Sequence, residues 1–205
     1  MDNGWFVSVR EPNAGEVRPG LSGIRIATDV LGNRWVLRDG HDEVAAYAVA
    51  AAVFDGIVPL TVQYDEHRSA QMFVDGRTAD ELGPDLYMAV RSSERAILDI
   101  ANMVVMDYVV GNSDRHSNNW LVTADGRVAA IDNTVGAERI TLRQALRPAY
   151  RALLVDDPDY TPTVIEGIMQ ALSRFVQITE DMAAIHDALT DVGRWRHDLK
   201  YVRGI

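Results

Sequence analysis

Apolar and polar positions alternate over short stretches in the first part of the chain. Residues 22–29 (SGIRIATD) and 33–39 (NRWVLRD) are rich in β-branched and aromatic residues, and Gly32 lies between them at a turn. Residues 58–75 (VPLTVQYDEHRSAQMFVD) have the pattern of a second hairpin. These patterns predict antiparallel strands joined by tight turns.

Two longer stretches have the composition of helices. Residues 42–54 are rich in alanine, begin with two acidic residues and end before Gly56, which predicts a helix. Residues 92–110 begin with serines and are then densely apolar, which predicts a central helix. An Asp-Gly turn predicts a hairpin over residues 120–132, and helical patterns interrupted by prolines follow Thr141.

The composition is that of a globular protein with one ordinary domain or two small lobes. The chain has 205 residues, of which 47% are hydrophobic, and no apolar run has the length of a membrane span. It begins without the features of a signal peptide and contains no cysteine, so we expect a cytoplasmic protein with no membrane insertion. The formal net charge of −10 argues against nucleic-acid binding.

Polar residues interrupt the apolar pattern in the sequence GNSDRHSNNW (111–120). Asp114 and Asn119 lie in this loop, and Asp132 ends the second strand of the hairpin that follows. Because a hairpin folds back on itself, we expect Asp132 to return to the level of the loop. Carboxylate and amide oxygens bind Mg²⁺, and phosphoryl transfer requires a carboxylate near the acceptor hydroxyl. Turn capping is the alternative role for Asp114 and Asn119.

The segments GNSDRHSNNWLV and VAAIDN resemble the catalytic and metal-binding segments of the protein-kinase-like superfamily. The branch they resemble is the phosphatidylinositol 3-/4-kinase-like and HipA-like one, where Asp-Arg-His-x-x-Asn replaces the His-Arg-Asp order of ordinary protein kinases. RWVLRDGHDEVAAYAVAAAVFDGIVP resembles the strand and helix that carry the nucleotide-binding lysine and its glutamate partner. SAQMFVD resembles the strand and hinge that contact adenine. The similarity covers residues 22–132.

The resemblance implies an α+β, bilobal, minimal protein-kinase-like fold. An N-lobe of residues 1–75 would hold an antiparallel sheet and one helix, and a mainly helical C-lobe of residues 76–205 would hold the catalytic loop. ATP and Mg²⁺ are the implied cofactors, and a protein Ser/Thr or a small hydroxyl compound is the implied acceptor. The acidic charge and the lack of a basic amphipathic helix disfavour a lipid acceptor.

The resemblance also implies the residues of the site. The catalytic residues would be Asp114, His116 and Asn119, and the magnesium ligands would be Asn119 and Asp132. The nucleotide would be bound by a phosphate-covering turn, basic strand residues, a paired glutamate and a hinge: Ser22, Gly23, Arg25, Arg38, Glu43, Met72, Phe73 and Val74. For His116 the alternative is a structural loop residue, and for Glu43 it is a carboxylate that favours the start of a helix.

Two departures from the family pattern leave the activity open. Arg38 stands where the family has its lysine, and a planar guanidinium is not equivalent to an ammonium group. Asp132, Asn133 and Thr134 stand where Asp-Phe-Gly is usual, so the metal ligand is kept and the phenylalanine is not. The expected function is an ATP- and Mg-dependent kinase. The alternatives are a catalytically inactive kinase-fold binding protein (a pseudokinase) and an ATP-dependent adenylyl transferase.

Overall fold

The chain has an α+β fold with antiparallel sheets, as the sequence predicts. The computed structural model describes residues 4–13, 16, 23–54, 56–91, 93–136, 139–141, 144–145 and 161–181. Within these residues, no helix is long and apolar enough to cross a membrane.

The first sheet has five strands in the order β1-β2-β3-β5-β4, and every neighbouring pair is antiparallel. Its strands are Phe6–Arg10 (β1), Arg25–Asp29 (β2), Arg34–Asp39 (β3), Thr61–Gln63 (β4) and Arg68–Met72 (β5). The buried side chains of Ala27, Leu37 and Ala70 belong to a small apolar cluster on one face of this sheet. The other face carries Arg38, because successive side chains of β3 alternate between the faces.

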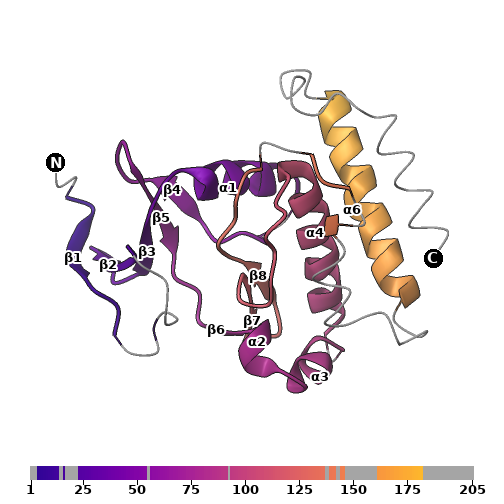
Figure 1. Ribbon diagram of the computed structural model, residues 1–205, viewed down its shortest axis with the longest axis horizontal. Helices are drawn as coiled ribbons and strands as arrows, with labels where there is room; N and C mark the ends of the chain where they lie inside the picture. Colours follow the sequence, from indigo (N-terminus) through magenta and orange to yellow (C-terminus); the bar gives the residue numbers. More distant parts are fainter. Residues whose placement is uncertain are drawn as a thin grey trace.

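A second, three-stranded antiparallel sheet has the order β6-β7-β8. Its strands are Gly76–Thr78 (β6), Trp120–Thr123 (β7) and Val128–Ala130 (β8). The described helices are Asp42–Val53 (α1), Ala79–Leu82 (α2), Asp85–Arg91 (α3), Glu94–Val110 (α4) and Thr161–Asp181 (α6). Figure 1 shows the first sheet on one side of the molecule, α4 and α6 on the other, and the second sheet between them.

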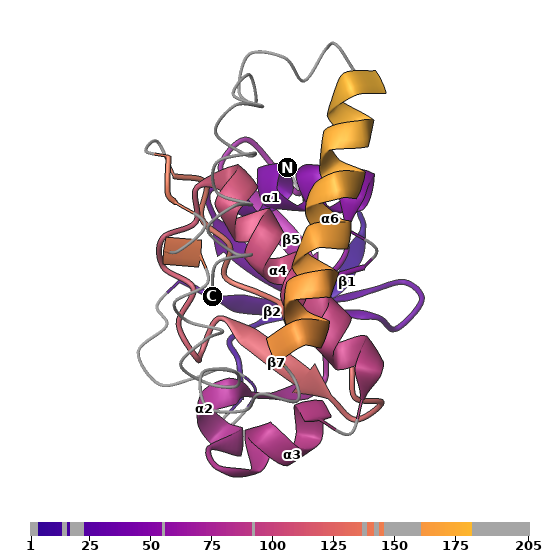
Figure 2. The ribbon, with the colours of Figure 1, turned by 90° about the vertical axis from the view of Figure 1, so that its right-hand side faces the viewer.

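Helix α4 runs through the main core. The Ser93 hydroxyl accepts a hydrogen bond from the Ala96 N–H at 3.1 Å and so caps the helix start. Gly111 ends the helix in the left-handed conformation, with a φ of 72°. Ile100 and Met103 are among its fully buried side chains, and α6 packs along it in both views (Figures 1 and 2). Contact on several sides explains why the apolar positions of α4 are so dense.

A buried carboxylate ties the β7-β8 hairpin to α4. Asp99 has no exposed surface and accepts hydrogen bonds from Arg127 Nε at 2.7 Å and from the Val128 N–H at 3.0 Å. Trp120, at the start of β7, is 1% exposed. Because α4 leads into the loop 111–119 and β7 leads out of it, these contacts fix both ends of the loop.

The predicted helix over residues 42–54 is confirmed as α1, and the predicted hairpins are confirmed as β4-β5 and β7-β8. The sequence pattern did not predict β1 or β6. Four of the five residues in β1 are exposed, so burial imposes no alternation of apolar and polar residues there. Strand β6 has only three residues, which is too short for a readable pattern.

Candidate functional site

Arg38 joins strand β3 to helix α1 and to the segment after β8. Its Nη1 lies 3.0 Å from Glu43 Oε1, and its Nη2 lies 2.7 Å from Asp132 Oδ1. Asp132 has a φ of 53°, a left-handed conformation that aspartate tolerates better than most residues. Its side chain is 32% exposed, whereas that of Arg38 is 17% exposed. Residues that are far apart in the sequence therefore meet at one partly open point.

The Glu43 carboxylate is buried and, besides Arg38, has hydrogen-bond donors in Asn133 and Gln71. Asn133 donates from its main-chain N–H to Oε1 at 3.0 Å and from Nδ2 to Oε2 at 2.8 Å. Gln71 Nε2 donates to Oε2 at 3.2 Å. Burial raises the pKa of Glu43, and the hydrogen bonds from Asn133 and the charge of Arg38 act in the opposite direction. These donors and this cation are what stabilise the ionised form.

Arg115 is a buried cation whose five N–H donors all have acceptors. Two donors bind the carboxylate of Asp107 in α4, with distances of 3.0 Å from Nε to Oδ2 and 2.8 Å from Nη2 to Oδ1. The others bind the carbonyl oxygens of Asn119 and Ile131 and the Oδ1 of Asn133. Because a guanidinium presents its donors in fixed directions, Arg115 sets the relative positions of α4, the loop and the segment after β8.

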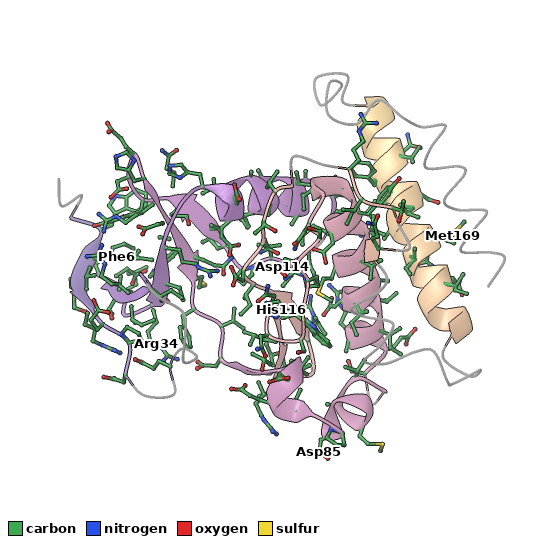
Figure 3. All side chains as sticks on the ribbon, in the orientation of Figure 1. Phe6, Arg34, Asp85, Asp114, His116 and Met169 are labelled. Carbon is green, nitrogen blue, oxygen red and sulfur yellow. The ribbon has the colours of Figure 1, made fainter. Side chains whose placement is uncertain are left out.

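Polar side chains hold the loop 111–119 in place. Asn112 Oδ1 accepts hydrogen bonds from the Asp114 N–H at 3.1 Å and from Thr134 Oγ1 at 2.9 Å. Asn119 Nδ2 donates to the Asp114 carbonyl oxygen at 3.0 Å. The Asp114 side chain is exposed, and Figure 3 shows it between the first sheet and α4 in that view. An exposed carboxylate on a fixed backbone can accept a proton from a bound ligand.

His116 lies beside Asp114 in the loop and is also exposed (Figure 3). Its Nδ1 is 3.2 Å from the Asn118 nitrogen and accepts that N–H, so the proton of the neutral ring is on Nε2. Its main-chain N–H donates to the Asp114 carbonyl oxygen at 2.9 Å. The ring therefore has a structural role through Nδ1, and its Nε2–H has no acceptor among the described residues.

Asp132 and Asn119 present the oxygen atoms that magnesium prefers. Asn119 uses its Nδ2 for the Asp114 carbonyl, which leaves its Oδ1 without a donor among the described residues. The described chain contains no group of three His, Cys, Asp or Glu side chains that could hold a metal ion. Magnesium that is bound together with ATP needs only one or two protein ligands, because water and phosphates complete its coordination. The donor set therefore fits a nucleotide-bound magnesium ion rather than an all-protein metal site.

Two residues with predicted nucleotide roles, Gly23 and Arg25, lie just before β2 and at its start. Arg25 is paired with Leu37, and directly paired residues share a face of the sheet. Arg25 therefore lies on the face opposite to Arg38, and the structure does not bring the two arginines together. Gly23 is exposed and has a φ of 76°, which favours glycine there. Ser22 lies outside the described residues.

Met72, Phe73 and Val74 connect the end of β5 to β6. The Phe73 N–H donates to the Arg34 carbonyl oxygen at 2.9 Å, and the Arg34 guanidinium lies 4.1 Å from the centre of the Phe73 ring. All three residues of this segment are half-buried. The connection between the two sheets is thus held to β3 by its main chain and by a cation–π contact.

Sequence reasoning missed the residues that support the site from within the protein: Gln71, Asp107, Asn112, Arg115 and Asn133. Asp107 is one of two aspartates, with Asp99, in the apolar stretch of α4, and this was a visible signal because a buried charge requires a partner. No pattern in the sequence pairs Asp107 with Arg115, or Asn133 with Glu43.

A comparison with protein families identifies the family of the chain. A family model described as phosphatidylinositol 3- and 4-kinase matches residues 61–197, about two thirds of the chain. The matched range includes Asp114, Asn119 and Asp132, and it begins after Arg38 and Glu43. A comparison with individual curated proteins finds no match. Because the family model covers well over half of the sequence, the chain belongs to the phosphatidylinositol 3- and 4-kinase family.

Proposed function

We propose that the protein is an ATP- and magnesium-dependent kinase that transfers the γ-phosphate to a protein Ser/Thr or a small hydroxyl acceptor. The observation that carries this proposal is the double ion pair of Arg38 with Glu43 and Asp132. It joins a cation, a helix carboxylate and a carboxylate suited to magnesium at one point. Membership of the family supports phosphotransfer of the kinase type.

In this proposal Arg38 binds the phosphates of ATP, and Glu43 holds Arg38 in position. Asp132 and Asn119 would hold magnesium, which neutralises charge on the phosphates when it is bound. Arg38 contacts Asp132 directly, so nucleotide binding requires the guanidinium to exchange this carboxylate for phosphate oxygens. Both arrangements keep each charge near an opposite one, which limits the electrostatic cost of the exchange.

Asp114 is the proposed catalytic aspartate. Its exposed carboxylate accepts the proton of the acceptor hydroxyl as the oxygen attacks the γ-phosphate and the bond to the leaving ADP breaks. The Nε2–H of His116 donates a hydrogen bond near the transferred phosphate. Arg115, fully occupied by protein acceptors, does not touch substrate and acts by positioning the loop.

Residues 1–75 form the N-lobe and residues 76–205 the C-lobe in this proposal. The half-buried segment 72–74 is the hinge that contacts adenine, and the turn at Gly23 covers the phosphates. The net charge of −10 favours a protein or small-molecule acceptor over an anionic lipid surface, which repels an acidic protein. The likeness of the loop to the HipA-like branch stays a prediction.

Paired labelling with ATP tests the proposal. The protein is incubated with magnesium and either γ- or α-labelled ATP, in the presence of Ser/Thr peptides or of phosphatidylinositol vesicles. We expect label from the γ position on the peptides or on the protein itself, and none after Asp114→Asn or Asp132→Asn. Label from the α position would instead establish adenylyl transfer. No transfer and no thermal stabilisation by ATP would overturn the proposal in favour of a pseudokinase.

A further inference from the structure

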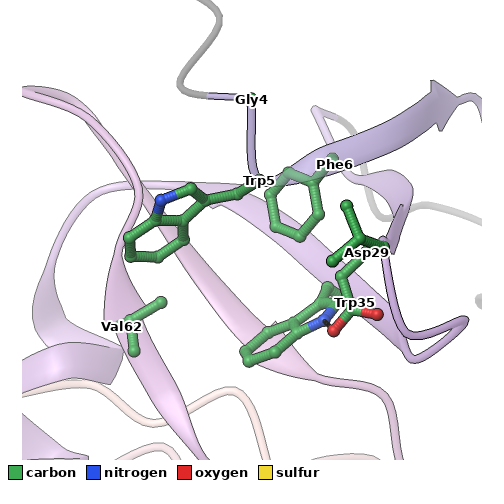
Figure 4. Close-up of a pocket in the computed structure, with 7 residues that line it drawn as sticks. Gly4, Trp5, Phe6, Asp29, Trp35 and Val62 are labelled. Carbon is green, nitrogen blue, oxygen red and sulfur yellow. Dashed lines mark hydrogen bonds between the residues drawn. The ribbon is translucent and has the colours of Figure 1, made fainter.

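The face of the first sheet opposite to Arg38 carries a hollow of about 290 Å³. Its walls are mainly aromatic: Trp5, Phe6 and Trp35 line it, together with Val62 and Asp29. Figure 4 shows the indoles of Trp5 and Trp35 on two sides of this hollow. None of these residues belongs to the proposed kinase site, so the two proposals can be tested separately.

Two of the aromatic walls are held in place by contacts within the sheet. Trp35 Nε1 donates a hydrogen bond to Asp29 Oδ2 at 3.0 Å. The Phe6 ring lies 6.1 Å from the Trp35 ring and 5.2 Å from the Tyr64 ring, between ring centres. Trp5 is 53% exposed and forms the outer wall. The hollow is thus largely formed before any ligand binds, which reduces the cost of binding.

The hollow also contains an uncompensated negative charge. Asp29 accepts hydrogen bonds from the Leu31 N–H, from the N–H and Nδ2 of Asn33, and from Trp35 Nε1, at 2.9 to 3.0 Å. All four donors are neutral, and no cation in the described part of the chain pairs with Asp29. These hydrogen bonds lower the pKa of Asp29 to about 2, and the bond from the Asn33 side chain has the largest effect. Asp29 is therefore ionised at neutral pH.

We propose that this hollow binds a methylated ammonium group, such as the trimethylammonium of a small soluble molecule. The faces of indole and phenyl rings attract cations, and an indole that donates its N–H to a carboxylate is more electron-rich. The Asp29 oxygens already have four donors, so a cation with N–H groups would find few acceptors here. A trimethylammonium group has no N–H groups and carries its charge on methyl groups that pack against aromatic walls.

Nuclear magnetic resonance titrations of the full chain test this proposal. The probes are choline, free trimethyllysine and 3,3-dimethyl-1-butanol, which is the neutral isostere of choline. We expect choline or trimethyllysine to shift the indole N–H signals of Trp5 and Trp35, and the neutral isostere to bind about tenfold more weakly, within the range of a cation–π contribution. Choline and trimethyllysine share the trimethylammonium group and differ in the group attached to it. Comparing their affinities therefore shows whether the hollow prefers a hydroxyethyl group or an amino-acid side chain. The N–H signal of the buried Trp120 reports that the fold is intact.

Variants of the outer wall complete the test. Trp5→Leu should weaken binding of the cationic probe about tenfold, and Trp5→Phe should keep most of it. Val7→Ala, two residues further along in β1 and outside the lining, should not change it. Equal affinity for choline and its neutral isostere would overturn the proposal. Unchanged choline binding by a folded Trp5→Leu protein, or no shift in the native protein with either cationic probe, would overturn it too.

Discussion

Asn133 donates two hydrogen bonds to Glu43, one from its main chain at 3.0 Å and one from its side chain at 2.8 Å, across 90 residues of sequence. Its Oδ1 accepts a hydrogen bond from Arg115. One amide side chain therefore connects helix α1 to the cation that organises the loop of Asp114. Asn133, which the resemblance aligns with the phenylalanine of Asp-Phe-Gly, thus forms a polar link between these two parts of the protein.

We predict that Asn133→Ala destabilises the protein by about 3 kcal/mol, because it removes a hydrogen bond to a buried carboxylate and leaves a donor of Arg115 unsatisfied. Urea unfolding measures the change. Asn118→Ala is a matched control from the nearby loop, since the Asn118 Oδ1 is buried without a partner among the described residues. The control should change stability by less than about 1 kcal/mol. Similar losses in the two variants would contradict the role of Asn133.

The donors of Arg115 lead to a second prediction. Arg115→Lys keeps the charge but cannot supply five donors in the directions of a guanidinium. We expect a loss of about 3 kcal/mol in the free energy of unfolding, because acceptors of the buried ion pair with Asp107 and of the loop are left unsatisfied. Arg68→Lys is the matched control, since the Arg68–Asp65 pair is partly exposed and its loss should change the free energy of unfolding much less. If Arg115→Lys lowers the free energy of unfolding no more than Arg68→Lys does, a positive charge at position 115 is sufficient and the directions of the guanidinium donors do not matter.

The sequence predicted elements whose signals are local. Helix α1 begins with two acidic residues and ends before Gly56, and α4 begins after a capping serine. The residues that determine these helix ends therefore lie next to them in the sequence. The alternation in β2 and β3 reflects a buried face, which β1 lacks. Strand register is a longer-range property, and it is the register that places Arg25 away from Arg38. A shift by one residue would have reversed this result.

The site could be predicted only as far as residue types have recognisable spacing. Asp114 and Asn119 stand out because they share a short loop between apolar segments. Besides Arg38, the partners of Glu43 in the structure come from β5 and from the segment after β8. Asparagines are common in turns, so the presence of Asn133 in the sequence gives no reason to expect that it is buried and bonded to Glu43 and Arg115. Such pairings follow from the packing of the two sheets and not from any local pattern.

Glu43 gives a prediction about pH. Burial raises its folded-state pKa above the ordinary value of 4.5. Its contribution to stability is therefore fully present below the ordinary value and is lost as the pH rises through the folded-state pKa, where a buried carboxyl must ionise. Glu43→Gln cannot ionise, so the free energy of unfolding of the native protein minus that of the variant should fall as pH rises. Urea unfolding from about pH 4 to about pH 8 measures this difference. A difference that rises with pH would show that its partners outweigh burial.

Arg38 gives a prediction about ATP binding that also separates it from Arg25. The two arginines lie on adjacent strands but on opposite faces of the sheet, so Arg25→Ala is a matched control for Arg38→Ala. Calorimetric titration with ATP and magnesium should give an affinity at least about tenfold lower for Arg38→Ala, because the phosphate contact is lost and Glu43 stays unneutralised. Arg38→Lys should bind within about threefold of the native protein, since the charge is kept and only the link from one guanidinium to both carboxylates is lost. Arg25→Ala should bind as the native protein does. If Arg25→Ala weakens ATP binding and Arg38→Ala does not, the phosphates lie on the other face of the sheet, and the ion pair of Arg38 with Asp132 serves only to hold the two sheets together.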